Sequence, residues 1–160
     1  PKMLAEVNRQ INKCIDLLGV RNKEALPKIV IASNDDLNDT LGSYVACENK
    51  LYINSETLHR KAYEKYLATL KNPASRNPLM TMLHEMIHWQ DARKYVAKFG
   101  EITQQDEYMA HIIEKHRSFV DKLVQKRYNF AEISDYASRM YIGGRYDEVM
   151  TEYRVKKLLG

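Results

Sequence analysis

Two histidines and a glutamate lie within five consecutive residues, in the segment His84-Glu85-Met86-Ile87-His88. On an α-helix, residues four positions apart share a face, so His84 and His88 can direct two imidazoles at one point. Imidazoles at this spacing suit Zn²⁺, which binds histidine nitrogen at about 2.0–2.1 Å. Glu85 can reach a metal-bound water without being a metal ligand. The pattern therefore predicts a zinc ion with a general base beside it.

Apolar residues surround the motif on both sides, at Leu79, Met80, Met82, Leu83, Met86 and Ile87. Such a segment is expected to form a helix that is buried nearly all round. A buried histidine or glutamate without a partner costs several kcal/mol, and a metal ion would supply that partner. The alternative is a chance match in which both histidines are satisfied core residues.

A catalytic zinc site has three protein ligands and one position left for water, so a third ligand must come from another element. Six side chains later in the chain are of the right type, namely Glu107, His111, Glu114, His116, Glu148 and Glu152. Asp91 lies on the same side of the motif helix as the two histidines. It is either a carboxylate that orients a ligand histidine or a solvated charge.

The spacing of apolar residues predicts the elements that position these side chains. A helix over 1–19 ending at Gly19 precedes a strand over 28–32, and segments 42–47 and 50–54 form a hairpin turning at 48–49. Further helices are expected over 56–71 with Ser55 as N-cap, from Pro78 to Phe99 with Gly100 as the stop, over 103–127 and over 147–159. Gly143 and Gly144 mark a sharp break before the last helix.

This order predicts a single α+β domain over residues 1–160. The 160 residues are 44% apolar and 29% charged, which is ordinary for a globular protein. The net charge of +4 is mild, and no basic stripe with interleaved aromatic residues is visible, so no nucleic-acid partner is expected. No apolar run is long enough to span a membrane.

Cys14 and Cys47 lack the spacing of metal ligands, and Cys14 is expected to be a buried free thiol. Two isolated cysteines and no visible signal peptide fit a reducing compartment such as the cytoplasm. The chain begins at Pro1 rather than at a methionine, so the sequence leaves open whether it belongs to a longer protein.

The motif and the order of the elements from about Pro27 onward resemble the zincin metallopeptidases, in their gluzincin branch. The resemblance implies a zincin-like fold, in which a small mixed sheet with an edge strand packs on the buried motif helix. That resemblance implies a zinc-dependent endopeptidase in which Glu85 is the general base. It also implies a peptide substrate bound as an extended strand along a sheet edge, here either 50–54 or 42–47. No third histidine follows at the short distance of the metzincin pattern.

Within the zincins, the chain most resembles the lethal-factor-like enzymes and the similar domains of phage head proteins. Their Ser-x-Tyr-Ala/Gly and Glu-x-x-x-Glu patterns match Ser134-Asp135-Tyr136-Ala137 and Glu148-Val149-Met150-Thr151-Glu152. The resemblance implies that Glu148 is the third zinc ligand and that Glu152 supports a ligand. Tyr136 would donate to the oxyanion, although Tyr141 matches the family's spacing to the glutamate better. A phage-associated location is then an alternative to the cytoplasm.

Two rival resemblances leave the third ligand open. SprT-like proteases share the sequence His-Glu-Met-Ile-His. Their third zinc ligand is a histidine in a His-x-x-Phe segment, which His116-Arg117-Ser118-Phe119 matches. ImmA-like zincins use a Glu-x-x-Ala segment, which Glu107-Tyr108-Met109-Ala110 matches. Two other functions also stay open: a non-catalytic zincin-like module of a phage or secretion assembly, and a DNA-associated protease of the SprT type.

Overall fold

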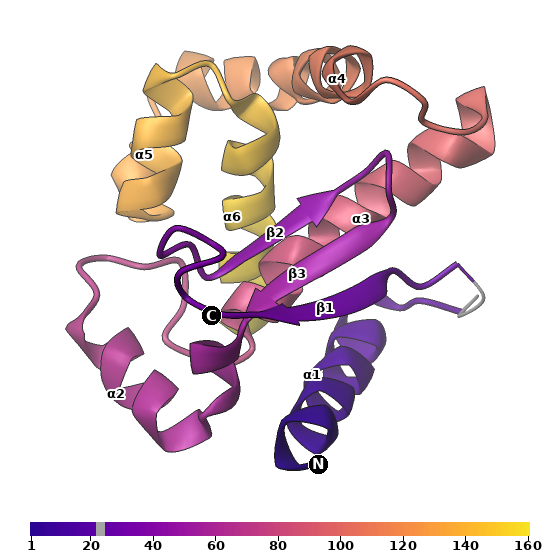
Figure 1. The fold of residues 1–160 in the computed structure, drawn as a ribbon. Helices are drawn as coiled ribbons and strands as arrows, with labels where there is room; N and C mark the ends of the chain where they lie inside the picture. The colour runs from indigo at the N-terminus through magenta and orange to yellow at the C-terminus, as the bar shows by residue number, and fades with distance from the viewer. Residues whose placement is uncertain (22–24) are drawn as a thin grey trace.

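The computed structural model describes residues 1–21 and 25–160. Over these residues the chain has the expected α+β organisation, with a small mixed sheet and helices around it (Figure 1). In chain order the elements are α1 (Lys2–Leu18), β1 (Lys28–Ala32), β2 (Gly42–Val45), β3 (Lys50–Asn54), α2 (Arg60–Thr69), α3 (Met80–Phe99), α4 (Gln105–Gln125), α5 (Asp135–Ile142) and α6 (Tyr146–Leu159). Short 3₁₀ turns occupy Ser55–Leu58 and Phe130–Glu132.

The sheet has the strand order β1-β3-β2, with β1 parallel and β2 antiparallel to β3. Gly42 pairs with Ile53 and Val45 with Lys50, and the hairpin turns over residues 46–49. Because β3 is hydrogen-bonded on both sides, it has no free edge for a substrate. Of the two strands that were expected to bind substrate, only β2 keeps an open edge.

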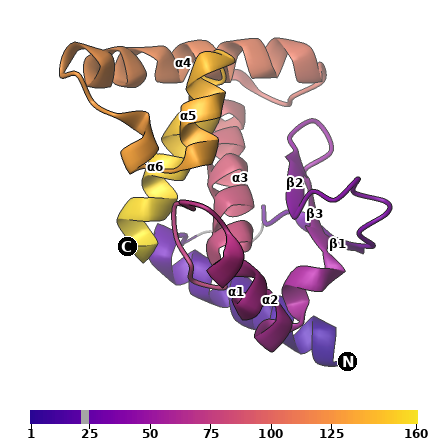
Figure 2. The same cartoon turned by 90° about the vertical axis from the view of Figure 1, so that its left-hand side faces the viewer.

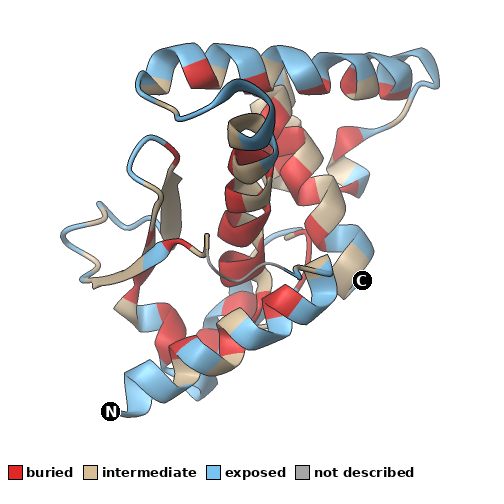
Figure 3. Cartoon of the chain, turned by 90° about the vertical axis from the view of Figure 1, so that its right-hand side faces the viewer, coloured by how far each residue is buried: buried red, intermediate tan, exposed pale blue. Residues whose placement is uncertain are grey.

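The helix α3 carries the motif and forms the centre of the molecule. It lies behind the sheet and is buried along most of its length, as Figure 3 shows. Met82, Leu83, Met86 and Ile87 are fully buried and pack with Leu51 and Ile53 of β3 and with residues of α1 and α6. The expectation of a helix buried nearly all round is confirmed. The helix α3 stops at Gly100, as the sequence predicted, and the φ of 88° at this residue is readily accessible only to glycine.

The prediction of a helix over 56–71 with Ser55 as its N-cap is wrong at the start of the helix. The Asn54 side chain, not Ser55, accepts the Glu56 backbone N–H and caps the 3₁₀ turn. The α-helix α2 begins only at Arg60, after His59. Asn54 can cap because it is fully buried and its amide also donates to the Thr40 carbonyl, which holds its oxygen in place.

The C-terminal helices pack on one another, and α6 also packs on α3. In Figure 2, α4 lies across one end of α3 and α6, while α6 runs beside α3. Val120, Ile133, Ala137 and Val149 form a second apolar cluster between α4, α5 and α6. The helix α5, for which the apolar spacing gave no expectation, begins at Ser134, whose hydroxyl accepts the Ala137 N–H. No helix in the described part of the chain combines the length and apolar character needed to cross a membrane.

Candidate metal centre

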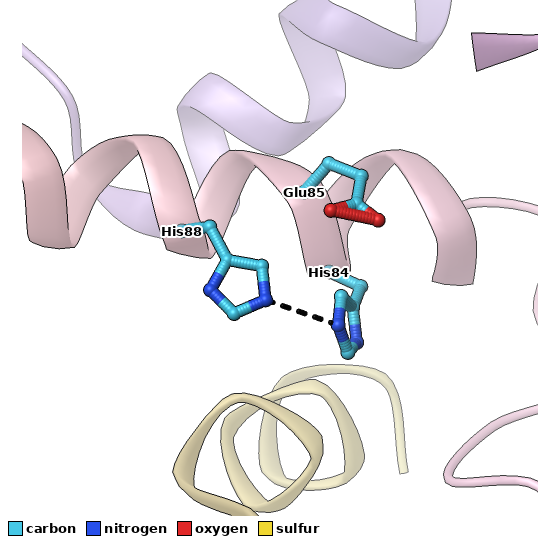
Figure 4. A group of neighbouring side chains, drawn as sticks. All are labelled: His84, Glu85 and His88. Carbon is cyan, nitrogen blue, oxygen red and sulfur yellow. Dashed lines mark hydrogen bonds between the residues drawn. The ribbon is translucent and has the colours of Figure 1, made fainter. Parts of the chain in front are cut away.

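His84 and His88 lie one turn apart on α3, and both imidazoles point toward α6 (Figure 4). Their Nε2 atoms are 3.2 Å apart. One donor atom from each of His84, Glu85 and His88 lies within 4.8 Å of the other two. The two imidazoles therefore converge on one point, as their four-residue spacing predicted.

The two glutamates at the start of α6 face the two histidines. The carboxylate of Glu148 lies 2.8 Å from His84 Nε2 and 3.1 Å from His88 Nε2. Glu152, one turn further on the same face, accepts a hydrogen bond from His84 Nδ1 at 2.9 Å. These are the positions that the lethal-factor-like resemblance implies for a third ligand and for its supporting carboxylate.

The three donor groups fit a zinc ion. Ligand atoms around a tetrahedral Zn²⁺ with bonds of about 2.1 Å are separated by about 3.4 Å. His84 Nε2 lies 2.8 Å from Glu148 Oε2, His88 Nε2 lies 3.1 Å from Glu148 Oε1, and the two Nε2 atoms are 3.2 Å apart. A small outward movement of the side chains would admit the ion. Two imidazole nitrogens and one carboxylate at such short range compete for the same protons, whereas one dication between them would satisfy all three.

The electrostatics of the cluster also favour a bound cation. Burial disfavours the charged imidazole, yet the Glu148 carboxylate raises the pKa of His88, and raises the pKa of His84 well above its ordinary value with help from Glu152. Burial opposes the charge of Glu148 too, but His88 and His84 hold the pKa of this carboxyl far below its ordinary value. The groups together stabilise positive charge at the point where they converge.

Glu85 is buried beside the histidines but has no hydrogen bond to them among the described residues. Burial raises the pKa of Glu85, although His84 and His88 partly oppose this shift. A carboxylate with a raised pKa accepts a proton more readily, as a general base must. Gly42 of β2 packs against it: a Cβ on Gly42 would lie 3.1 Å from Glu85 Cγ and from Thr81 Cγ2. A glycine here therefore lets the edge strand lie close to the motif.

The structure separates the two tyrosines that the sequence left as alternatives. The Tyr136 ring lies edge-on to His84, with ring centroids 6.0 Å apart, and Tyr136 lines the cavities on both sides of the cluster. Burial, Glu148 and Glu85 raise its pKa, so the hydroxyl keeps its proton and can donate it to a hydrogen bond. Tyr141 instead stacks on Phe130 at 4.3 Å, within the second apolar cluster.

The ligands implied by the rival resemblances do not join the cluster. Glu107 is exposed in the first turn of α4. His116 is buried and its Nε2 donates to Asp91 at 3.0 Å, not to the motif histidines. The burial of Asp91 and this bond contradict the idea that Asp91 is a solvated charge. Among the described residues no hydrogen bond joins Asp91 to His84 or His88, so it does not orient a ligand histidine directly. His111 packs between Tyr95 and Phe99.

Two cavities open on either side of the cluster and share His84, Glu85, Gly42 and Tyr136 as walls. One has a volume of about 420 Å³ and extends toward the end of α2 and the start of α5. The other has a volume of about 430 Å³ and extends along β2 toward α4. The second cavity forms a cleft along β2 beside the candidate metal ligands.

Comparison of the chain with protein-family models, with curated proteins and with solved structures finds no match. The assignment of the site therefore depends on its own geometry and on the motif.

Several residues of the site could not be found from the motif alone. Ser134 donates to Glu152 Oε1 at 2.9 Å, so the same hydroxyl caps α5 and holds the carboxylate that orients His84. Thr151 lies 3.5 Å from His88 Nδ1. Arg145 pairs with Asp147 and approaches Glu148 at 3.5 Å. In the sequence, only the Ser-x-Tyr-Ala pattern pointed to Ser134, and nothing indicated the contacts of Thr151 and Arg145.

Proposed function

We propose that the protein is a zinc-dependent metallopeptidase. The observation that carries this proposal is the convergence of His84, His88 and Glu148 from two helices, with Glu85 beside them and facing the same cleft. A purely structural zinc site closes all four positions with protein ligands, whereas three ligands leave one for water. The buried Glu85, which is not needed to hold the ion, favours hydrolysis over a structural role.

Each residue has a distinct role in the reaction. Zinc held by His84, His88 and Glu148 would polarise the scissile carbonyl and lower the pKa of a water toward about 7. Glu85 takes the proton from that water and passes it to the leaving amine. The hydroxyl of Tyr136 donates to the oxygen that becomes negative in the transition state. The substrate lies as an extended strand along the free edge of β2, whose backbone groups provide the pairing.

The first test separates metal binding from catalysis. His84→Ala and Glu148→Ala should each lower zinc affinity by orders of magnitude, because each removes a ligand. Glu85→Gln should keep the zinc content and the melting temperature while hydrolysis falls by about 10²–10⁴-fold, since it removes only the base. Zinc content is measured by elemental analysis of purified protein, and hydrolysis with a mixture of peptides whose products are identified by mass spectrometry.

Glu107→Ala is the matched control for Glu148→Ala, because both residues are glutamates in the first turn of a long helix. It should leave zinc binding intact. Zinc lost from Glu107→Ala but kept by Glu148→Ala would transfer the third ligand to α4 and overturn the assignment. A wild-type protein that binds stoichiometric zinc yet hydrolyses no peptide would instead be a non-catalytic module.

A further inference from the structure

The cleft beside β2 is closed at one end by α4. The strand β2 begins at Gly42 next to Glu85 and runs toward the hairpin turn, which packs on α4 (Figure 2). Ala46 of this turn is buried against Tyr108 and Ile112, and the Cys47 N–H donates to Gln105 Oε1 at 3.0 Å. The end wall of the 430 Å³ cavity consists of the side chains Gln105, Tyr108, Met109 and Ile112.

The wall leaves room for only a short piece of substrate. Gly42 is level with the reacting groups, since a Cβ there would touch Glu85. Three residues of β2, 43–45, lie between this level and the turn that meets α4. At about 3.3 Å per residue this is about 10 Å, the length of about three residues of an extended chain. Beyond this length the cavity is bounded by side chains of α4, among them Tyr108 and Met109.

The polar groups that line this cavity include hydrogen-bond donors that are only partly paired. Asp147 accepts Arg145 Nε at 3.1 Å and Arg145 Nη2 at 3.0 Å, and Glu148, which faces the histidines, lies 3.5 Å from the same Nη2. Within the part of the chain that the structure describes, Arg145 Nη1, the Tyr108 hydroxyl and the Gln105 amide nitrogen have no protein partner. Arg145 is also the one arginine or lysine among the described residues lining this cavity.

We propose that the closed end binds the free α-carboxylate of a peptide, so that the protein removes one to three residues from the carboxyl end of its substrate. This inference rests on the proposed peptidase function and narrows it from internal cleavage to cleavage near a chain end. Water adds across the scissile amide: its hydroxyl joins the carbonyl carbon and its proton goes to the leaving amine. That amine belongs to the short fragment whose carboxylate is held by Arg145 and Tyr108.

The test uses one decapeptide in three forms: with both ends free, with an amidated carboxyl end, and with an acetylated amino end. The free acid should be cut within three residues of its carboxyl end. Amidation should lower kcat/KM at least tenfold, because it removes a charged acceptor from an arginine. Acetylation should change nothing. An amidated peptide with glutamate near its end shows whether a side-chain carboxylate can substitute, which would contradict recognition of the chain end.

Variants of the closed end distinguish binding from general damage. Arg145→Gln and Tyr108→Phe should lower the preference for the free-acid peptide over the amidated peptide, measured as the ratio of their kcat/KM values. The comparison is made at equal zinc content, because Arg145 also lies 3.5 Å from Glu148. Arg117→Gln, an exposed arginine on α4, is the matched control and should behave like the wild type. An equal loss on both peptides would indicate a structural role and contradict the proposal.

Failure of this inference can be distinguished from failure of the peptidase function. Internal cleavage that is equally fast with the amidated peptide would overturn the closed-end proposal and leave the peptidase standing. If the wild type cuts no peptide, calorimetric titration of the zinc-loaded Glu85→Gln variant decides the matter. The tripeptide acid should bind at least tenfold more tightly than its amide, and equal affinities or no binding would overturn the inference.

Discussion

At the scale of single residues, a chain of hydrogen bonds connects the N-cap of α5 to the candidate metal ligands. Ser134 donates to Glu152, Glu152 accepts from His84 Nδ1, and His84 Nε2 faces Glu148. A hydrogen bond to the outer nitrogen of a ligand imidazole fixes its orientation and makes it a better metal donor. Glu152 is therefore a positioning residue, and Ser134 acts through it.

Removing this support should weaken zinc binding without abolishing it. Glu152→Ala should lower zinc affinity by about 10–100-fold, the usual effect of losing a partner behind a metal ligand. Ser134→Ala should have a smaller effect on affinity and should also destabilise the fold by about 1 kcal/mol through loss of the N-cap. Competition with a chromophoric chelator measures the first quantity and urea unfolding the second.

Ser138→Ala is the control for this pair, because Ser138 lies on the helix that Ser134 caps but, among the described residues, its side chain takes no part in this chain of bonds. It should bind zinc like the wild type. A Glu152→Ala variant with wild-type zinc affinity would show that the carboxylate does not orient His84.

At the scale of elements, the buried pair of Asp91 and His116 joins α3 to α4. Asp91 Oδ2 accepts from His116 Nε2 at 3.0 Å, and both side chains are almost fully buried. Burial alone would raise the pKa of Asp91, but the hydrogen bond and charge of His116 lower it below the ordinary value of 3.8. His116, which the sequence left as a candidate zinc ligand, therefore joins α4 to α3 instead.

His116→Ala should destabilise the protein at neutral pH by about 1–3 kcal/mol, because it leaves a buried carboxylate without its partner. Zinc binding should be nearly unchanged, since His116 is not in the cluster. The free energy of unfolding from urea titration and the zinc content of the same sample measure both effects. Zinc lost together with stability would return His116 to the ligand set.

The same pair should depend on pH in a defined direction. Since the pKa of Asp91 is lower in the folded state than in the unfolded state, its stabilisation is fully present above about pH 4 and is lost as the pH falls through the folded pKa. The difference in stability between the wild type and His116→Ala should therefore shrink below pH 4. Arg117→Ala on the exposed side of α4 should show no such dependence.

At the scale of the whole molecule, the candidate metal centre joins two parts of the fold that are far apart in the chain. Two ligands come from α3, which packs on the sheet and α1, and Glu148 comes from α6, which packs on α4 and α5. The helix α6 contributes to both apolar clusters, through Val155 and Val149. An ion bound between α3 and α6 would therefore stabilise the arrangement of both parts.

Zinc should raise the thermal stability of the protein. At a free concentration 100 times the Kd, binding to the folded state adds about 2.7 kcal/mol. For a chain of this size that corresponds to an increase in Tm on the order of 5–10 °C. Calorimetry with and without zinc measures the change, and a chelator should reverse it. The same increase in Glu148→Ala would show that zinc binds elsewhere.

The local pattern of the sequence was sufficient to predict most of the helices and strands and the part of the site that lies on α3. Strands 28–32 and 50–54, the helix ending at Gly19 and the helix from the motif to Gly100 are where the apolar spacing placed them. The closeness of His84, Glu85 and His88 also follows from helical geometry alone. These features depend on residues within one or two turns of each other, and a linear pattern carries that information.

Contacts between distant elements were decided only by the tertiary structure. From the sequence alone, Glu107, His116 or Glu148 could approach the histidines, and either Tyr136 or Tyr141 could flank them. The packing of α6 beside α3 brings Glu148 to the cluster, and α5, which packs on α6, brings Tyr136. The Asp91–His116 bond between α3 and α4 gives His116 a different partner. Likewise, which strand has a free edge depends on pairing: β3 is covered on both sides, which no periodicity within the strand can indicate.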